Sequence, residues 1–313
     1  MPDSLPLSIV IITKNEASRL ADCLDSVRWA GEILVVDDES TDETVQIARR
    51  YTDRVFQRRM DLEGRHRNWA YAQANNDWVF SLDADERVTP ELAREIQDLL
   101  RGEPESDVYS VPRRNYIGRR WLRYGGWYPS PQVKLFRRSV FSWEETTVHP
   151  RALTRSSKPW GALKQDLIHY SYRDLTDFVG KLNRQTTLEA QKWVQDQRRM
   201  SLGKGLWRTL DRFARSFWFK RGYRDRFLGY FAAVHAGLYQ FLSFAKYWHL
   251  KSGTVPGTVV PGTGGSGTGA GSGPSPRSKL SVVILAYNAQ ATIPRCLKSV
   301  GWADERIVVD GGS

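Results

Sequence analysis

Trp78-Val79-Phe80-Ser81-Leu82-Asp83-Ala84-Asp85-Glu86 is an apolar run that ends in carboxylates. The run has the length and composition of a buried strand bounded by polar residues, so Asp83 and Asp85 are expected at the exposed carboxyl end of that strand. Mg²⁺ and Mn²⁺ prefer such oxygen ligands and complete their coordination with substrate phosphates. The motif therefore predicts a metal site, while a solvated turn that opens a helix at residues 85–90 is the alternative.

Strand and helix patterns alternate on the N-terminal side of this run. Runs of strand length at residues 8–13, 33–36 and 55–56 are separated by helical patterns, the first with Leu20, Cys23, Leu24 and Val27 on one face. Ser40-Thr41-Asp42-Glu43 has the residue types of a capping box and predicts that a helix opens there, and residues 65–74 are also expected to be helical. The alternation predicts an α/β fold with a mostly parallel, doubly wound sheet flanked by helices.

In such a sheet, ligands bind beyond the carboxyl ends of the strands. Thr13, Asp37 and Asp83 each follow or end a predicted strand, so we expect them to meet at one crevice. Three polar strand ends in one place are a stronger indication of a binding site than any one of them.

With these motifs the chain resembles a family 2 glycosyltransferase of the GT-A fold, most like the branch that glucosylates the inner core of bacterial lipopolysaccharide. The matching runs are residues 8–16, 35–42, 67–70 and 77–86, followed by 134–138, 148–149 and 169–175. The resemblance extends over most of the first 250 residues. It implies a Rossmann-like catalytic domain that binds a nucleotide-sugar and Mg²⁺ or Mn²⁺.

The resemblance also implies roles for particular residues. The donor nucleotide is expected to contact Thr13, Asn15, Glu16, Asp37, Asp38, Arg67, Asn68 and Asp83. Among these, Asp37 would meet the ribose or base and Arg67 the pyrophosphate. Asp85 would bind the metal directly, with Asp83 supporting it or meeting the ribose. His169 ends another apolar run and is a candidate third metal or phosphate ligand, although a structural role is the more common one for a lone histidine.

The predicted reaction needs a general base for the acceptor hydroxyl, and a carboxylate usually fills that role. Glu145 and Glu144 are the candidates, with a solvated surface loop as the alternative for both. Relatives of this branch usually carry Val-His-Glu where this chain has Val148-His149-Pro150, so a role of that missing glutamate would pass to another residue. His149, Arg137 and Trp127 are candidates for contacts with the acceptor or a phosphate, and Trp127 lies in a glycine-containing loop that is either flexible or a packed turn.

Positive charge is concentrated near the C-terminal end of the region that resembles the family. The chain of 313 residues has a net charge of +11, and residues 198–226 hold ten Lys or Arg against two Asp, interleaved with aromatics. Nothing nearby resembles a nucleic-acid-binding module, so an amphipathic helical hairpin on an anionic membrane surface is expected. Residues 227–247 are long enough to span a membrane, which is the second hypothesis, and packing on the catalytic domain is the third. Two cysteines and no signal-like leader favour a cytoplasmic protein, peripheral on the inner face of the membrane.

The chain ends with a repeat of its own beginning. Leu280–Ser313 aligns without gaps to Leu7–Ser40, with 16 of 34 positions identical. We therefore expect four segments: a GT-A domain at 1–200, membrane-associating helices at 201–251, a Gly/Ser/Thr/Pro linker at 252–279, and at 280–313 the truncated start of a second glycosyltransferase domain.

The leading functional hypothesis is an inverting transfer of a hexose from a nucleotide-sugar, first of all a UDP-sugar, to a cell-envelope glycolipid such as the lipopolysaccharide core. A nucleotidyltransferase would share the Rossmann-like half and the acidic site, but it would need a glycine-rich loop after the first strand, which residues 13–18 do not supply. A catalytically degenerate scaffold that binds nucleotide-sugar is the third hypothesis, because of Pro150.

Overall fold

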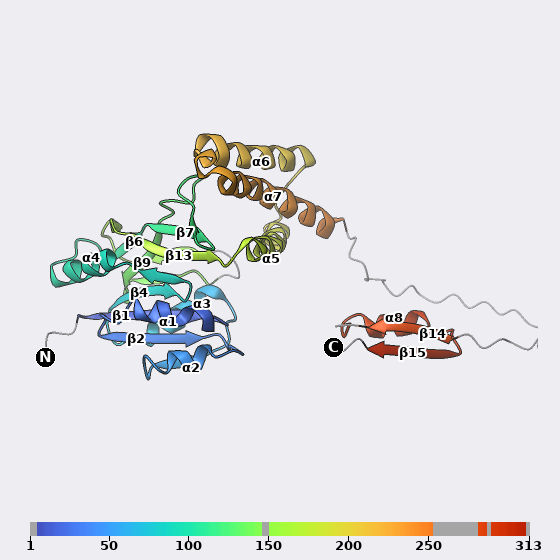
Figure 1. Ribbon diagram of the computed structural model, residues 1–313, viewed down its shortest axis with the longest axis horizontal. Helices are drawn as coiled ribbons and strands as arrows, with labels where there is room; N and C mark the ends of the chain where they lie inside the picture. The colour runs from blue at the N-terminus through green and yellow to red at the C-terminus, as the bar shows by residue number, and fades with distance from the viewer. Residues whose placement is uncertain (1–4, 146–149, 253–280, 287–288, 311–313) are drawn as a thin grey trace, which may run out of the picture. The chain divides into compact units, whose positions relative to one another are not determined.

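The structure is a computed structural model that describes residues 5–145, 150–252, 281–286 and 289–310 (Figure 1). It divides into two compact units, Met1–Gly257 and Thr258–Ser313. The first unit contains the elements β1 (Leu7–Thr13), α1 (Ala17–Asp25), β2 (Glu32–Asp37), α2 (Thr44–Ala48), β3 (Val55–Gln57), α3 (Glu63–Ala72), β4 (Trp78–Asp83), β5 (Glu86–Val88), α4 (Pro90–Arg101), β6 (Val108–Val111), β7 (Arg113–Ile117), β8 (Arg120–Trp121), β9 (Gln132–Arg137), β10 (Phe141–Trp143), β11 (Ala152–Thr154), β12 (Gly161–Ala162), β13 (Leu167–Tyr172), α5 (Leu175–Gln195), α6 (Leu202–Ala214), η1 (Arg215–Phe219), η2 (Gly222–Asp225) and α7 (Arg226–Lys251).

The main sheet has seven strands in the order β12-β6-β9-β4-β1-β2-β3. Strands β4, β1, β2 and β3 are mutually parallel, whereas β9 is antiparallel to both of its neighbours. A second sheet has the order β5-β13-β7-β8. The predicted α/β class with a largely parallel sheet and flanking helices is confirmed.

Alternating side chains of the central strands bury both faces of the sheet. Ile9 and Ile11 of β1 point to one face, where they pack with α1 and α4, while Val10 points to the other face and packs with α3. Because both faces are covered, the strands consist almost entirely of apolar residues, and the polar residues come at the strand ends.

One local prediction at these strand ends is wrong, and the alternative considered for residues 85–90 does not hold either. Ser40 does not open a helix, because its hydroxyl donates to Asp37 and α2 begins only at Thr44. The residues after Asp85 do not open a helix either: Glu86–Val88 form strand β5, which pairs with β13, and α4 begins at Pro90 with Thr89 as its N-cap. In both places a contact with residues outside the local motif replaces the local helix signal.

Helices α6 and α7 form the expected hairpin, joined through η1 and η2. One face of α7 packs against α5 and α6, burying Ala232, Ala233, Phe244 and Tyr247. Among the helices that the structure describes, none combines the length and hydropathy that crossing a membrane requires. The spanning hypothesis for residues 227–247 is therefore wrong, and the hairpin is in part packed on the catalytic domain.

The second unit contains β14 (Ser281–Ala286), α8 (Ile293–Ser299) and β15 (Glu305–Asp310). β14 and β15 are parallel, with Ser281 opposite Glu305 and Ala286 opposite Asp310. The aligned positions of the first unit, Ser8 with Glu32 and Thr13 with Asp37, are partners in the same way. The repeat in the sequence is thus a repeat of the strand-helix-strand element. The predicted linker falls almost entirely outside the described residues.

Candidate functional site

The carboxyl ends of β1, β2 and β4 lie side by side at one edge of the main sheet. Thr13 is the register partner of Asp37, and Ile12 is the partner of Asp83. The structure therefore brings together the three strand ends that the sequence singled out.

Thr13 is the best-placed of these residues for a bound ligand on the β1–β2 side. Its side chain is 3 % exposed, and its hydroxyl has no hydrogen-bond partner among the described residues. A buried polar group without a partner is uncommon in proteins. The hydroxyl is thus available to a group that enters this edge of the sheet.

The carboxylates at the end of β2 are already engaged by the protein. Asp37 accepts hydrogen bonds from the backbone N–H and the hydroxyl of Ser40. Asp38 accepts from the Lys14 ammonium at 2.8 Å and from the Met60 N–H at 2.7 Å. Burial works against ionisation of Asp38, but the Lys14 and Met60 hydrogen bonds hold its pKa below the usual range. Both side chains fix the loops that follow β1 and β2.

Asn15 and Glu16 form the loop between β1 and α1. Asn15 has a φ of +53°, a left-handed conformation that is uncommon outside glycine, and its side chain accepts from the Thr41 N–H at 2.8 Å. Glu16 lies 3.4 Å from Arg173, and burial raises the pKa of its carboxyl. The loop is therefore held in one shape by contacts with the β2 side and with Arg173.

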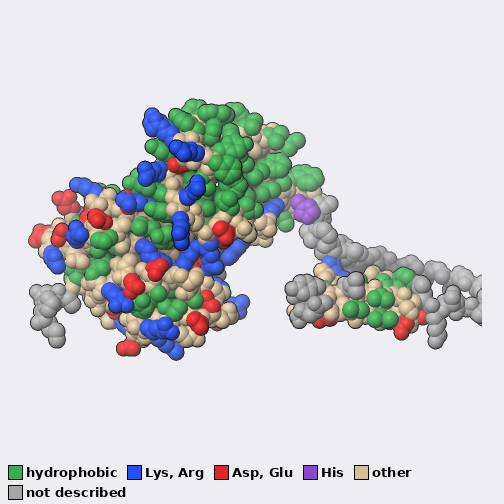
Figure 2. Space-filling view, viewed as in Figure 1, with side chains coloured by type: hydrophobic (Ala, Val, Ile, Leu, Met, Phe, Trp, Pro, Cys, Tyr) green, Lys and Arg blue, Asp and Glu red, His purple; other side chains and the backbone are tan. Residues whose placement is uncertain are grey.

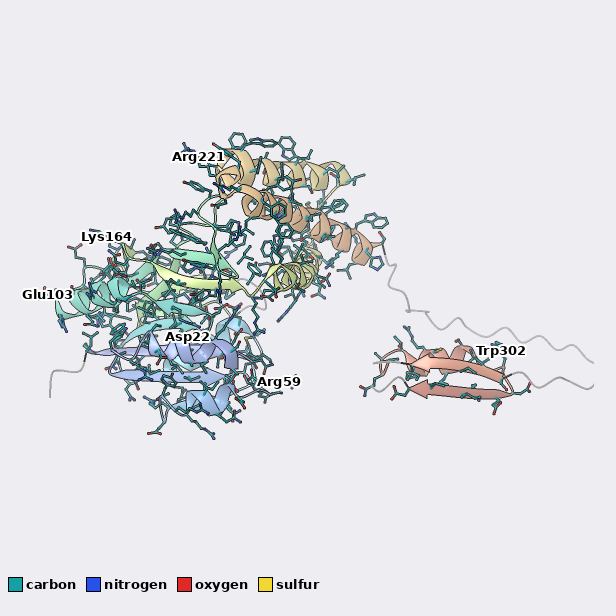
Figure 3. All side chains as sticks on the ribbon, viewed as in Figure 1. Asp22, Arg59, Glu103, Lys164, Arg221 and Trp302 are labelled. Carbon is teal, nitrogen blue, oxygen red and sulfur yellow. The ribbon has the colours of Figure 1, made fainter. Side chains whose placement is uncertain are left out.

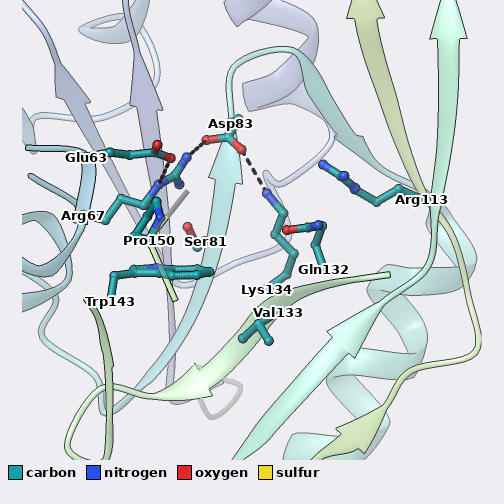
Figure 4. A pocket seen from close by; sticks show the side chains of 10 residues that line it. All are labelled: Glu63, Arg67, Ser81, Asp83, Arg113, Gln132, Val133, Lys134, Trp143 and Pro150. Carbon is teal, nitrogen blue, oxygen red and sulfur yellow. Dashed lines mark hydrogen bonds and ion pairs between the residues drawn. The ribbon is translucent and has the colours of Figure 1, made fainter. Parts of the chain in front are cut away.

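Asp83 lies between cations at the end of β4. Its carboxylate is 3.1 Å from Arg67 and 3.0 Å from Lys134, and Arg67 also contacts Glu63 at 3.1 Å (Figure 4). Burial favours the neutral acid, but the Arg67 and Lys134 charges hold the pKa of Asp83 well below its usual range. Arg67 thus contacts Asp83 directly, and both oxygens of Asp83 are paired with protein cations.

Glu86 extends this ion-pair network into the interior. It is fully buried and contacts Lys134 at 2.5 Å and Arg113 at 3.5 Å, while it also accepts from the Asp83 N–H at 3.0 Å. The sequence reasoning missed Lys134, Arg113 and Glu63 as site residues. Lys134 lies in one of the matching runs, but nothing local in the sequence shows that it reaches Asp83, 51 positions away.

A cavity of about 360 Å³ lies beside this network, within the size range of small-ligand sites. It is lined by Glu63, Arg67, Ser81, Asp83, Arg113, Gln132, Val133, Lys134, Trp143 and Pro150 (Figure 4). Carboxylates and cations from α3, β4, β7 and β9 face one another across it, and the Trp143 ring forms an apolar wall. The cavity offers both donors and acceptors to a polyhydroxylated ligand.

Asp85 faces His169 at the same strand end. Asp85 Oδ2 is 3.6 Å from His169 Nε2, and His169 Nδ1 is 2.7 Å from Asn115 Oδ1. Because the Asn115 amide N–H donates to the Trp127 carbonyl, its Oδ1 is the acceptor and His169 Nδ1 carries the proton. In the neutral imidazole, Nε2 therefore presents its lone pair towards a carboxylate.

This arrangement fits a divalent cation between Asp85 and His169. Burial disfavours the Asp85 anion, yet a hydrogen bond and the positive charge of a protonated His169 hold the pKa of that carboxyl below its usual value; a cation would take the place of this Nε2 proton. Among the described residues, no three His, Cys, Asp or Glu side chains gather into a metal-binding group. A cation here would take few protein ligands and complete its shell with phosphate oxygens and water, as Mg²⁺ commonly does.

The predicted base residues lie outside the cavity lining. Glu145 is on the surface, paired with Arg65 at 2.8 Å, and Glu144 accepts from the Arg151 N–H at 3.4 Å. Asn68 does not face the cavity either, because its amide exchanges hydrogen bonds with the backbone of Trp143 at 2.9 and 2.8 Å. The contacts of Asn68 with Trp143 and of Arg65 with Glu145 join α3 to the end of β10 and the residues just after it.

The other predicted contacts fall elsewhere. Arg137 is opposite Trp78, at the far end of β4 from Asp83, where it pairs with Asp77 and Asp107. Trp127 packs against Tyr172 and Phe178 in a closed turn, which is the packed alternative for that loop. His149 lies outside the described residues.

Comparison with known proteins identifies the family of this site. Residues 8–158 match the model of the family described as glycosyl transferase family 2. The chain is 27% identical over 259 residues to the lipopolysaccharide core biosynthesis glycosyltransferase LpsC of Rhizobium meliloti, covering 79% of this chain and 94% of the relative. It is also 25% identical over 250 residues to an uncharacterized glycosyltransferase of Rickettsia felis, covering 77% of this chain and 88% of the relative.

A solved structure of Staphylococcus aureus TarS, residues 1–349, is similar at 16% identity with a TM-score of 0.40, covering 80% of this chain and 92% of that one. The family match includes β1, β2 and β4 with Thr13, Asp37, Asp83 and Asp85. The α/β fold with a largely parallel sheet brings the strand ends among these residues to one edge. The chain carries a family 2 glycosyltransferase domain and is a glycosyltransferase.

Proposed function

We propose that this enzyme transfers a hexose from a nucleotide-sugar, first of all a UDP-sugar, to a cell-envelope glycolipid such as the lipopolysaccharide core, with inversion at the anomeric carbon. The proposal rests on the position of Thr13 and Asp83 at the carboxyl ends of the parallel strands β1 and β4, with Asp85 facing His169 of β13 just beyond, beside a polar cavity. The choice of acceptor is supported by the similarity to a relative named for lipopolysaccharide core biosynthesis.

The β1–β2 edge is the proposed site of the nucleotide. Thr13 offers an unpartnered hydroxyl there, and the loop at Asn15 and Glu16 is already held in place. Asp37 and Asp38 then contribute indirectly, by holding the loops after β1 and β2 in place. Other residues of those loops would contact the ribose or base. A loop that is ordered before binding reduces the entropy lost when the nucleotide binds.

The β4 edge is the proposed site of the diphosphate and the sugar. A bound Mg²⁺ or Mn²⁺, held by Asp85 and His169, would neutralise the charge that develops on the leaving nucleoside diphosphate. Arg67 and Lys134 fix Asp83 at the mouth of the cavity, where its oxygens can accept from sugar hydroxyls. The cavity beyond Asp83 then holds the sugar away from bulk water.

The acceptor hydroxyl must lose a proton to a base on the far side of the sugar. Besides Asp83, Glu63 is a carboxylate in the cavity lining, and its side chain is the more exposed of the two, 41 % against 30 %; it supplements the sequence candidates Glu144 and Glu145. The backbone of Glu144 and Glu145 closely approaches Gly64, the residue after Glu63 in α3, although both carboxylates lie outside the cavity lining. We also propose that the reaction takes place on the cytoplasmic side. The free thiol of Cys23, which is buried and forms no disulfide, is in keeping with a reducing compartment.

Nucleotide binding to the full chain tests the proposal. Thermal stability is measured with UDP, GDP, dTDP or CMP, each with and without Mn²⁺, for the wild type, Asp85→Asn, and the exposed control Asp22→Asn. A shift with one nucleotide that needs Mn²⁺, persists in Asp22→Asn and is lost in Asp85→Asn supports the donor site. Absence of any shift contradicts it.

Turnover separates an enzyme from a degenerate scaffold. Release of nucleoside diphosphate from the matching nucleotide-sugar, with a lipopolysaccharide-type glycolipid as acceptor, should depend on Asp85. Binding with the expected metal dependence but without turnover on any glycolipid would favour the scaffold.

A further inference from the structure

The turn region of the hairpin exposes large apolar side chains. Trp207, Leu210, Trp218 and Phe219 are 68, 66, 58 and 80 % exposed. Trp207 and Leu210 lie on one side of α6, three residues apart, and Trp218 and Phe219 follow in η1. Side chains of this size are normally buried, so a contiguous group in water indicates a binding surface.

Helix α7 carries a second exposed apolar stripe. Phe227, Tyr230, Leu238, Phe241 and Trp248 recur at helical spacing and are all exposed, whereas the opposite face of the helix packs on α5 and α6.

The stripes on the two helices are continuous. The Tyr230 ring lies 6.1 Å from that of Phe213 and 5.8 Å from that of Phe217, which ties the start of α7 to the end of α6. At the other end of the hairpin, Leu202 and Trp248 line one hollow. Figure 2 shows the resulting apolar surface over α6 and α7, with Lys and Arg side chains beside it.

Positive charge borders this surface at the turn. Lys220 and Arg221 follow Phe219 directly, and Figure 3 labels Arg221 at this end of the hairpin. Neither forms an ion pair with a described residue, nor does Arg226 at the start of α7, whereas Arg215 is paired with Asp211 at 2.7 Å. Cations without acidic partners, next to exposed aromatic rings, suit a surface that is apolar inside and negatively charged outside.

We propose that this α6–η1–α7 surface docks on an anionic lipid bilayer, with the aromatic side chains in the interface and Lys220 and Arg221 at the headgroups. A second copy of the chain fits less well, because a two-fold contact would place the same cations opposite one another. The hairpin lies on the bilayer, since none of the described helices has the properties of a membrane span. The proposal goes beyond glycosyl transfer and does not depend on it.

Vesicle co-sedimentation of the full chain tests the proposal. Vesicles of phosphatidylcholine are compared with vesicles that also contain phosphatidylglycerol, at low and high salt. We expect binding to the anionic vesicles only, weakened by salt because surface electrostatics are screened. Failure to bind anionic vesicles at low salt would overturn the proposal.

Two pairs of variants locate the surface. Lys220→Glu with Arg221→Glu should lower the partition coefficient about tenfold or more, while Arg49→Glu with Arg50→Glu, the same change in net charge on exposed residues elsewhere, should leave it near the wild-type value. Phe219→Ser should weaken binding, and the control Trp160→Ser, at a side chain that is 48 % exposed outside the hairpin, should not.

Unchanged melting temperatures would show that the variants remain folded, as expected for exposed positions. Equal loss in the test and control variants would mean that only net charge or general hydrophobicity matters, which contradicts docking through this surface. If the test variants alter the sedimentation of the protein without vesicles but leave vesicle binding intact, the surface would instead be a contact between two copies of the chain.

Discussion

Lys134 joins Asp83 to Glu86 inside the protein, and its replacement by methionine should lower the free energy of unfolding by about 3 kcal/mol. Lys134 is 4 % exposed and Glu86 is fully buried, so the ion pair between them is shielded from water. Methionine keeps most of the apolar stem of lysine and removes the charge. The change therefore reports on electrostatics more than on packing.

The magnitude follows from what remains around Glu86. Removal of one partner of a buried ion pair costs about 3–5 kcal/mol, and Arg113 at 3.5 Å compensates in part, which places the expected cost at the lower end.

Urea unfolding followed by circular dichroism at pH 7 measures this effect. The cycle Lys134→Met, Glu86→Gln and the double variant should give a coupling of roughly 2 kcal/mol, because the neutral pair no longer leaves a buried charge alone. Lys158→Met is the control, since Lys158 is 47 % exposed and its pair with Asp107 should contribute less than about 1 kcal/mol. A cost below about 1 kcal/mol at pH 7, or strictly additive losses, would refute the reasoning.

Three further predictions test other parts of the first unit. His235 stacks on Phe178, and burial lowers its pKa from 6.5 to about 4, so the folded state resists protonation; stability should be full above pH 6.5 and fall as the pH drops towards 4, by at most roughly 3 kcal/mol. His235→Phe should flatten this dependence in a series of melting curves, and an unchanged slope would contradict it. In Gly64→Ala the new methyl group would lie 2.0 Å from the Glu144 carbonyl oxygen, so urea unfolding should show a loss of about 1–3 kcal/mol; an unchanged midpoint would contradict the close approach. Glu145→Gln should reduce turnover little if its contact with Arg65 is structural, whereas a loss of about a hundredfold or more in kcat without a change in nucleotide binding would identify Glu145 as the base.

The strand ends were predictable because each depends on local sequence. An apolar run that stops at a polar residue fixes where a buried strand leaves the core, and parallel pairing then brings Thr13, Asp37 and Asp83 to one edge. The repeat at the end of the chain was also visible in the sequence. The structure confirms it, because β14 and β15 pair in the same parallel register as β1 and β2.

The errors arose where a distant segment determines the structure. Residues 86–88 carry a helix-start pattern, but they pair with β13, about 80 positions away in the sequence. Ser40 has the residue type of a helix cap, yet its hydroxyl accepts from the Asn15 N–H, 25 positions away, while it donates to Asp37. Arg137 lies in a motif that suggested a site residue, and only the antiparallel register of β9 places it at the far end of β4. No pattern within one segment contains that information.

The two carboxylates of the Asp-x-Asp motif have different surroundings, which the sequence could not distinguish. Asp83 ends β4 and is neutralised by Arg67 and Lys134, so a cation that bound it would have to displace an existing ion pair. Asp85 lies beyond the strand, and its ion-pair partner among the described residues is His169, whose protonated Nδ1 leaves Nε2 free to bind a metal once the imidazole is neutral. In the proposed site a divalent cation would therefore bind Asp85, because binding there leaves the ion pairs of Asp83 with Arg67 and Lys134 intact. The same ion pairs leave Asp83 oriented towards the cavity, which is where a sugar hydroxyl would need an acceptor. In the proposed site, the spacing of the motif would thus separate two tasks, cation binding and sugar binding, across one turn of the chain.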